Sequence, residues 1–371
     1  MARRVVSFYL HFPNCYHTQR SITQNGAPSL GPWIPAFAGM TDHDIGAGAS
    51  RPRLEFERFA GASRPRTAEK DTMSSIKHAA LAGQWYSGNP RALKAEIQSY
   101  LDQARMAEPP GEILAVMSPH AGYTFSGPVA GFSYRALQGR GIDTAIVLAV
   151  CHSGAAEASI LDVEACETPL GRIDIDRELV SEFRQSIPGL PYIKAAHTGA
   201  FGRPENSAEM QIPFIQTALP GARVVEILIG GQDPELGRQI GNGISSVLKN
   251  HPEKKFVLVA SSDMTHYPPY EDAVRIDGQT LEALVTLNEE YIRNRLAELE
   301  REPVRGLHCV LCGAGAVLVA LRAAGNLGAD RAEILAYRNS GDSTYGSRDE
   351  VVGYGSLAVY RSTAGASIST S

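Results

Sequence analysis

The run Ile113-Leu114-Ala115-Val116-Met117, followed directly by Ser118-Pro119-His120-Ala121-Gly122-Tyr123, combines the two features that decide the fold. An unbroken apolar run of this length is typical of a strand that is buried on both faces. The polar motif that follows carries a histidine, and Gly122 lets the backbone turn tightly close to it. A buried strand that ends in such a loop is typical of an α/β sheet with a site at its edge.

Similar apolar runs recur along the chain, at residues 145–150, 224–229, 256–260, 334–337 and 351–360, and we predict strands there. Helical periodicity is found between them, at residues 236–248, 281–299 and 314–324. Asn89-Pro90 supplies an N-cap and a first-turn proline for one more helix, an amphipathic one, near the start of the domain. This alternation predicts an α/β domain with a largely parallel sheet.

The predicted domain covers residues 73–361. Residues 1–72 show no sustained periodicity and contain Gly-Ala-Gly-Ala-Ser and repeated Arg-Pro-Arg stretches. We predict that they are disordered or an extension translated upstream of a natural start at Met73. Residues 362–371 are predicted to be a disordered tail.

Composition narrows the function classes. The 371 residues are 43% hydrophobic and 20% charged, which is ordinary for a globular protein with a large core. A net charge of -5 without a basic stripe argues against nucleic acid as a partner. No apolar run approaches the roughly 18 residues that a membrane span needs, so we expect a cytoplasmic protein without a membrane partner. Five sparse cysteines favour free or metal-bound thiols over a disulfide framework.

Three further polar motifs follow or precede predicted elements in the same way. Cys151-His152-Ser153-Gly154 follows the strand at 145–150, and Ser261-Ser262-Asp263-Met264-Thr265-His266 follows the strand at 256–260. Cys309-Val310-Leu311-Cys312 leads into the helix at 314–324. The carboxyl ends of parallel strands meet at one edge, where ligands bind.

Histidine and cysteine together indicate a transition-metal site. Neutral imidazole and thiolate suit iron, copper or zinc, and three protein ligands leave open positions for chemistry. The spacing of Cys309 and Cys312 predicts one ligand and one packing residue, since the sequence has no second cysteine pair to complete a closed zinc site. Asp263 is either a fourth ligand or an acceptor for a ligand imidazole N–H.

The ordered set of motifs resembles the Memo family, also called AmmeMemoRadiSam system protein B in bacteria and archaea. The resemblance runs from about Ala82 to Tyr360. The motifs that carry it are Pro119-His120-Ala121-Gly122-Tyr123, His152-Ser153, Thr168-Pro169-Leu170-Gly171, Glu205-Asn206-Ser207, Ser261-Ser262-Asp263, Cys312-Gly313 and Asn339-Ser340-Gly341-Asp342.

The resemblance implies a fold like that of class III extradiol dioxygenases, a three-layer α/β sandwich with a mixed, largely parallel central sheet. It also implies a metal held by His120, His152 and Cys312, with Asp263 as a further site residue. A cysteine in place of the carboxylate ligand of those dioxygenases favours iron or copper, with zinc as a further possibility. The resemblance therefore implies mononuclear redox or dioxygenase-type chemistry on an unknown small substrate. It also implies radical-SAM system proteins as possible partners.

One departure affects the expected chemistry. The family usually reads Glu-His-Ser where this chain has Glu205-Asn206-Ser207, and asparagine cannot shuttle a proton near neutral pH. Either His266 or His197 substitutes for the missing imidazole, or the reaction needs no such group, and we favour His266. The predicted catalytic residues are His266, Glu209 and Asp263, with Glu209 or His266 handling protons. Tyr123, Phe125 and Asn206 are predicted to line the substrate pocket.

Two alternatives remain open from the residues alone. A zinc metallohydrolase would use Asp263 or Glu209 as the base that activates a metal-bound water. A non-enzymatic module would keep the pocket to bind a small molecule, a peptide or the metal itself, and the Asn206 departure favours this reading.

Overall fold

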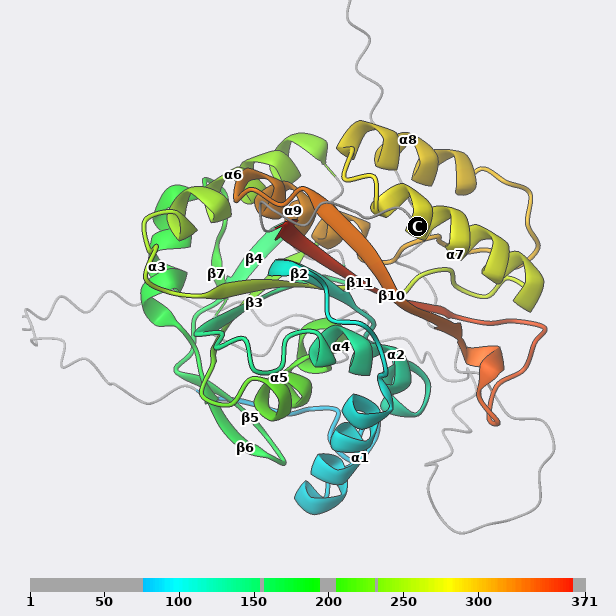
Figure 1. The fold of residues 1–371 in the computed structure, drawn as a ribbon, viewed down its shortest axis with the longest axis horizontal. Coiled ribbons are helices and arrows are strands. Elements are labelled where there is room, and N and C mark those ends of the chain that lie inside the picture. Colours follow the sequence, from blue (N-terminus) through cyan, green and yellow to red (C-terminus); the bar gives the residue numbers. More distant parts are fainter. Residues whose placement is uncertain (1–75, 154–156, 194–204, 231–232, 363–371) are drawn as a thin grey trace, which may run out of the picture. The chain divides into compact units, whose positions relative to one another are not determined.

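The computed structural model describes residues 76–153, 157–193, 205–230 and 233–362 (Figure 1). The predicted N-terminal extension, His197 and the predicted C-terminal tail beyond Ser362 lie outside these residues. In the described part of the chain, no helix has both the length and the apolar character that crossing a membrane requires.

The main sheet has eight strands in the order β10-β11-β2-β9-β3-β8-β4-β7. Its centre is parallel and consists of β2 (Gly111–Ser118), β9 (Phe256–Ser261), β3 (Thr144–Val150) and β8 (Arg223–Ile229). On one side of this centre, β11 (Gly353–Ser362) pairs antiparallel with β2, and β10 (Arg331–Asn339) pairs antiparallel with β11. On the other side, β4 (Ala158–Leu161) pairs antiparallel with β8, and β7 (Tyr192–Ile193) pairs parallel with β4 at the edge. The predicted mixed, largely parallel sheet is confirmed.

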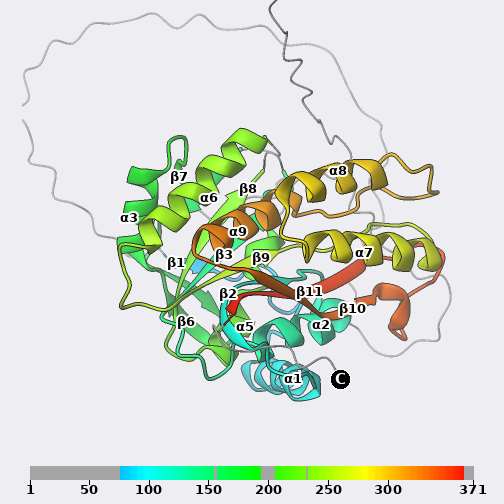
Figure 2. The ribbon, with the colours of Figure 1, turned by 45° about the horizontal axis from the view of Figure 1, so that its top comes forward.

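Helices cover both faces of this sheet, as the two views in Figures 1 and 2 show. On one face, α9 (Ala314–Asn326) packs directly on the central strands and against α6 (Pro234–Leu248). The same layer contains α3 (Arg177–Ser186), α7 (Tyr270–Leu284) and α8 (Glu289–Leu299). On the other face lie α1 (Pro90–Gln103), α2 (Tyr123–Arg135), α4 (Asn206–Glu209) and α5 (Ile212–Ala218). The helix predicted after Asn89 is α1, whose first N–H groups bond to the Asn89 side chain.

A small second sheet was not expected from the sequence. It consists of β1 (Ile76–His78), β5 (Ala165–Thr168) and β6 (Gly171–Asp174). These strands have three or four residues each, which is too short for alternation to be recognised against the background of the sequence.

The single helix expected over residues 281–299 is wrong. The structure has two helices there, α7 ending at Leu284 and α8 beginning at Glu289. Leu287 between them has a φ of 55°, in the left-handed region that a continuing helix cannot contain. Asn288 then caps α8 through a side-chain bond to the N–H of Tyr291. The apolar periodicity continues across the break because both helices bury residues in the same layer.

Candidate metal centre

Three central strands deliver polar residues to one edge of the sheet. Strands β2 and β9 end side by side, with Ser118 paired to Ser261, and His120 and Asp263 each follow two residues later. Strand β3 lies on the other side of β9 and is followed by His152. Cys312 comes from the loop before α9, where its N–H donates to the Asp263 carbonyl at 3.2 Å. Strand order thus gathers residues that are far apart in sequence.

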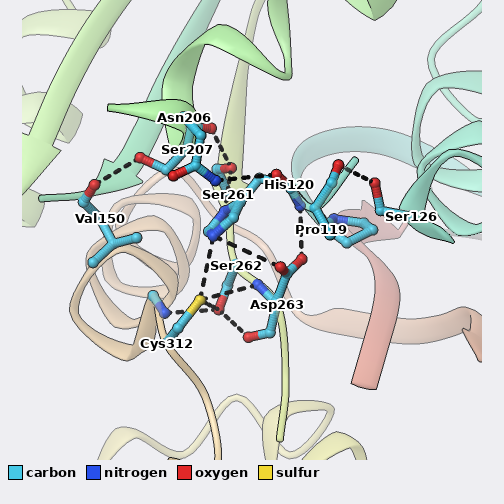
Figure 3. Close-up of polar contacts among 12 residues, drawn as sticks. Pro119, His120, Ser126, Val150, Asn206, Ser207, Ser261, Ser262, Asp263 and Cys312 are labelled. Atoms are coloured by element: carbon cyan, nitrogen blue, oxygen red, sulfur yellow. Dashed lines mark hydrogen bonds and ion pairs between the residues drawn. The ribbon is translucent and has the colours of Figure 1, made fainter. Parts of the chain in front are cut away.

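His120, His152 and Cys312 offer one ligand atom each, and these atoms all lie within 4.8 Å of one another. Cys312 Sγ is 3.4 Å from His120 Nε2, and Figure 3 shows the sulfur and this ring pointing toward each other. Tetrahedral ligands at ordinary metal–nitrogen and metal–sulfur distances stand about 3.6 Å apart. The two imidazole rings lie edge to face, with centroids 5.3 Å apart. This donor set therefore fits a transition-metal ion.

The tautomer of His120 follows from the hydrogen bonds of Ser261. The Ser261 hydroxyl donates its single proton to the Ser207 carbonyl at 2.6 Å and accepts from Gln211 Nε2 at 2.8 Å. It must therefore also accept from His120 Nδ1, which lies 3.0 Å away. The proton of His120 stays on Nδ1, and the lone pair of Nε2 faces Cys312.

His152 is oriented by a buried carboxylate in a similar way. Glu205 Oε1 accepts from His152 Nδ1 at 2.7 Å, and Oε2 accepts from the His152 backbone N–H at 2.8 Å. Burial by itself raises the pKa of Glu205, but the bonds from His152 and from the Ser207 N–H outweigh it and lower the pKa from 4.5 to about 2. Glu205 is thus ionised and leaves His152 Nε2 for a metal.

His120 is neutral at physiological pH. Burial, together with the neighbouring His152, lowers the pKa of His120 from 6.5 to about 3. Metal ligation requires the unprotonated imidazole, so His120 is in the form that binds a metal at pH 7.

Asp263 lies against two of the three candidate ligands. Its Oδ1 accepts from the His120 N–H at 2.7 Å, its Oδ2 is 3.9 Å from His120 Nε2, and its own N–H donates to Cys312 Sγ at 3.2 Å (Figure 3). Burial raises the pKa of Asp263 above its usual value. The carboxylate is close enough to act as an additional ligand or to orient the loop that carries His120.

The predicted proton-transfer residue His266 lies on the same loop as Asp263. Its Nδ1 donates to the Met264 carbonyl at 2.9 Å, so Nε2 is the nitrogen with a lone pair. Its backbone pairs with Cys309 on one side and Val352 on the other. Burial lowers the pKa of His266, which keeps the ring neutral. His197 cannot be compared because it lies outside the described residues.

Glu209 has a different environment from the one predicted. Its carboxylate accepts from the backbone N–H groups of Ala80 and Leu81 and from the Tyr86 hydroxyl, at 2.8 to 3.1 Å. These contacts tie the segment after β1 to α4, and Glu209 is only 3% exposed. They give this carboxylate a structural role, and its predicted acid–base role stays a prediction.

The three predicted pocket residues also differ in position. Tyr123 is 2% exposed in the main core, where its ring lies against Tyr86 and Phe214 and its hydroxyl donates to the Met210 carbonyl. Its predicted place in a substrate pocket stays a prediction. Phe125 is partly buried in a separate apolar cluster with Tyr267. Asn206 is at the site itself, since its amide donates to the His120 carbonyl at 3.2 Å (Figure 3).

Sequence reasoning missed the residues that orient the ligands. Glu205 appeared only as part of a motif, and Ser261 and Gln211 were given no role. A carboxylate that holds a ligand histidine is recognisable by its distance to the ring nitrogen, and Glu205 is 53 positions away from His152. No spacing rule in the sequence connects the two.

Glu205→Gln tests the orienting role of the carboxylate. We expect the affinity for the metal to fall about 10- to 100-fold, because the neutral amide no longer fixes the His152 tautomer or increases its basicity. Competition with a chelator at pH 7 measures the change. Glu182→Gln is the matched control, because Glu182 accepts from the ring of His251, through Nε2, in a partly buried pair away from the site. Equal affinities for Glu205→Gln and the control would contradict this assignment.

Comparison with known proteins gives a consistent result. Residues 77–358 match the family model described as Memo-like protein. MEMO1 family protein PAE0818 of Pyrobaculum aerophilum is 32% identical over 298 residues, which cover 77% of this chain and 99% of that protein. MEMO1 family protein Mbar_A1422 of Methanosarcina barkeri is 33% identical over 285 residues, covering 76% and 100%. The crystal structure of uncharacterized protein JW3007 from Escherichia coli K12 aligns with a TM-score of 0.42 at 14% identity, over 67% of this chain and 100% of that chain, a likeness too weak to support any conclusion.

Proposed function

The chain belongs to the Memo-like protein family, and from this premise we propose that it is a redox protein that binds one iron or copper ion through His120, His152 and Cys312. The observation that carries the proposal is the convergence of two imidazoles and one cysteine sulfur at the carboxyl edge of the sheet.

The composition of the donor set favours a redox-active metal. A single sulfur with two nitrogens is softer than the two-histidine, one-carboxylate set that holds ferrous iron in class III extradiol dioxygenases. With three protein ligands, the bound ion supplies open positions for dioxygen and an organic substrate, which is the basis for dioxygenase-type chemistry on a small molecule. A radical-SAM partner stays an expectation from the family resemblance.

In this proposal, the residues around the three ligands position the ligands and transfer protons. Asp263 fixes the His120 backbone and contacts the sulfur of the cysteine ligand through its own backbone N–H. His266 offers Nε2 for proton transfer, because its Nδ1 is engaged with Met264. Asn206 holds the His120 carbonyl and transfers no proton, so the reaction that we propose uses one fewer acid–base group than the family pattern provides.

The test is the metal content of protein purified without added metal, followed by oxygen uptake with iron or copper supplied. We expect one iron or copper per chain and oxygen uptake that increases in Asn206→His, where an imidazole is restored beside His120. Zinc as the bound ion, with no redox response, would overturn the proposal in favour of a metallohydrolase. A tightly bound metal with no oxygen uptake in either protein would overturn it in favour of a non-enzymatic binding module.

A further inference from the structure

A second cysteine lies in the same small buried cluster as the candidate sulfur ligand, three positions away in the chain. Cys309 and Cys312 pack together with Val150 in a small buried cluster, and their exposed fractions are 2% and 5%. The structure contains no disulfide between them. The proposed metal function uses only Cys312, so a second buried cysteine in the same cluster needs a separate explanation.

We propose that Cys309 is a redox modification site, which forms a disulfide with Cys312 when a hydroperoxide oxidises the pair, and so withdraws the sulfur ligand from the metal. The covalent step depends only on the two cysteines. Its consequence for metal binding rests on the function proposed above.

The backbone holds the two cysteines in place against one segment. Cys309 accepts the N–H of His266 through its carbonyl at 3.0 Å, and the Cys312 N–H donates to the Asp263 carbonyl at 3.2 Å. Between them the Val310 N–H donates to Glu300 at 2.9 Å. The backbone of the loop that carries both cysteines is therefore anchored at both ends and in its middle.

Both sulfurs have polar neighbours. Cys309 Sγ is 3.5 Å from His266 Nδ1, whose proton is donated to the Met264 carbonyl. Cys312 lies two residues before Ala314, the first residue of the 13-residue helix α9, and its sulfur accepts the Asp263 N–H at 3.2 Å. The thiolate is the form of cysteine that reacts with peroxides.

The chemistry balances with a hydroperoxide as the oxidant. One thiolate sulfur attacks the peroxide O–O bond, which breaks, and with one proton the products are a sulfenic acid and the corresponding alcohol or water. The second thiol then attacks that sulfur, so that the S–S bond forms, the S–O bond breaks and water leaves with the thiol proton. Two electrons pass from the sulfurs to the peroxide, and a dithiol reductant returns them.

The other described cysteines are engaged elsewhere. Cys151 Sγ lies 3.2 Å from Ser153 Oγ, and the Cys166 thiol donates to the buried Glu226 at 3.2 Å. Cys151 is the cysteine adjacent to a candidate ligand, so Cys151→Ser is the control for an unspecific effect of thiol loss near the site.

The experiment treats the reduced, metal-free full chain with hydrogen peroxide and maps disulfides by mass spectrometry without reduction. We expect a peptide pair linked through Cys309 and Cys312. We also expect an affinity for added copper or iron that falls at least about tenfold and returns after treatment with dithiothreitol. Cys151→Ser should behave as the unsubstituted protein does.

The Cys309→Ser and Cys309→Ala variants give the contrasting result. Both variants should bind the metal before oxidation. Cys309→Ala is included because the polar serine hydroxyl could disturb the apolar cluster with Val150. After peroxide they should lose binding in a way that dithiothreitol does not reverse, because a sulfenic acid on Cys312 without a partner thiol proceeds to the sulfinic acid. Reversible loss in these variants would overturn the proposal.

Other outcomes separate this proposal from the metal function. A linked pair that includes another cysteine, or no Cys309–Cys312 link at all, overturns the modification site even if the metal binds normally. A Cys309–Cys312 link that leaves the affinity for added metal unchanged overturns the proposed loss of metal binding on oxidation. A Cys309–Cys312 link in a protein that binds no metal when reduced supports the modification site and overturns the metal function.

Discussion

Replacing His120 by alanine is expected to lower the affinity for the metal by more than about 100-fold, since removing an orienting neighbour alone costs 10- to 100-fold. The variant loses one of three ligand atoms that lie within 4.8 Å of one another. The two remaining donors, His152 and Cys312, leave too few bonds for tight binding. Competition with chelators of graded affinity measures the loss, with the metal content of the purified protein as a second readout.

The matched control for this prediction is His251→Ala. His251 is a partly buried histidine whose ring bonds a polar side chain, Glu182, as the His120 ring bonds Ser261, but it lies after α6, away from the site edge of the sheet. Denaturant unfolding of the metal-free proteins separates a ligand effect from a folding defect. Unchanged metal affinity in folded His120→Ala would show that the imidazole does not bind the ion.

Lys77→Met is expected to lower the free energy of unfolding by about 3–5 kcal/mol, because it leaves the buried Glu226 carboxylate without its counter-charge. Lys77 Nζ lies 2.5 Å from Glu226 Oε2, and the two side chains are 7% and 0% exposed. Burial alone lowers the pKa of Lys77, but Glu226 more than reverses this and holds the pKa above its usual value, so the pair is ionised. The pair connects β1 of the small sheet to β8 of the main sheet.

Denaturant unfolding at pH 7 measures this loss against Lys254→Met. Lys254 pairs with Glu178 at 3.3 Å on the surface, and such exposed pairs contribute about 1 kcal/mol or less. The double variant Lys77→Met with Glu226→Leu should recover much of the loss, since both charges are then replaced by apolar groups. Similar stabilities for the Lys77→Met and Lys254→Met variants would contradict the importance of the buried pair.

The sequence predicted the framework of the site well because that framework rests on local pattern. An apolar run such as 145–150 is typical of a buried parallel strand. The residue that follows such a strand lies at the carboxyl edge of the sheet, and this does not depend on how the side chains pack. For this reason the sequence by itself places His120, His152 and Asp263 at one edge of the sheet. Cys312 was harder to assign, because it lies in a loop and is positioned by its contacts with Asp263.

Features that the sequence did not reveal depend on the direction of a side chain or on a single backbone angle. Glu209 and Asn206 belong to one four-residue helix, yet one bonds the segment after β1 and the other bonds His120. Tyr123 begins α2 and turns its ring into the core. The break at Leu287 depends on one backbone angle that periodicity does not record. Polar residue type and position in the chain do not determine which way a side chain points.

The most direct test of the metal centre is X-ray absorption spectroscopy of the metal-loaded protein at the edge of the bound ion. The account predicts one sulfur scatterer near about 2.3 Å and two imidazole nitrogens near about 2.1 Å, with the sulfur lost in Cys312→Ser. A first coordination sphere without sulfur, or with fewer than two imidazoles, would contradict it.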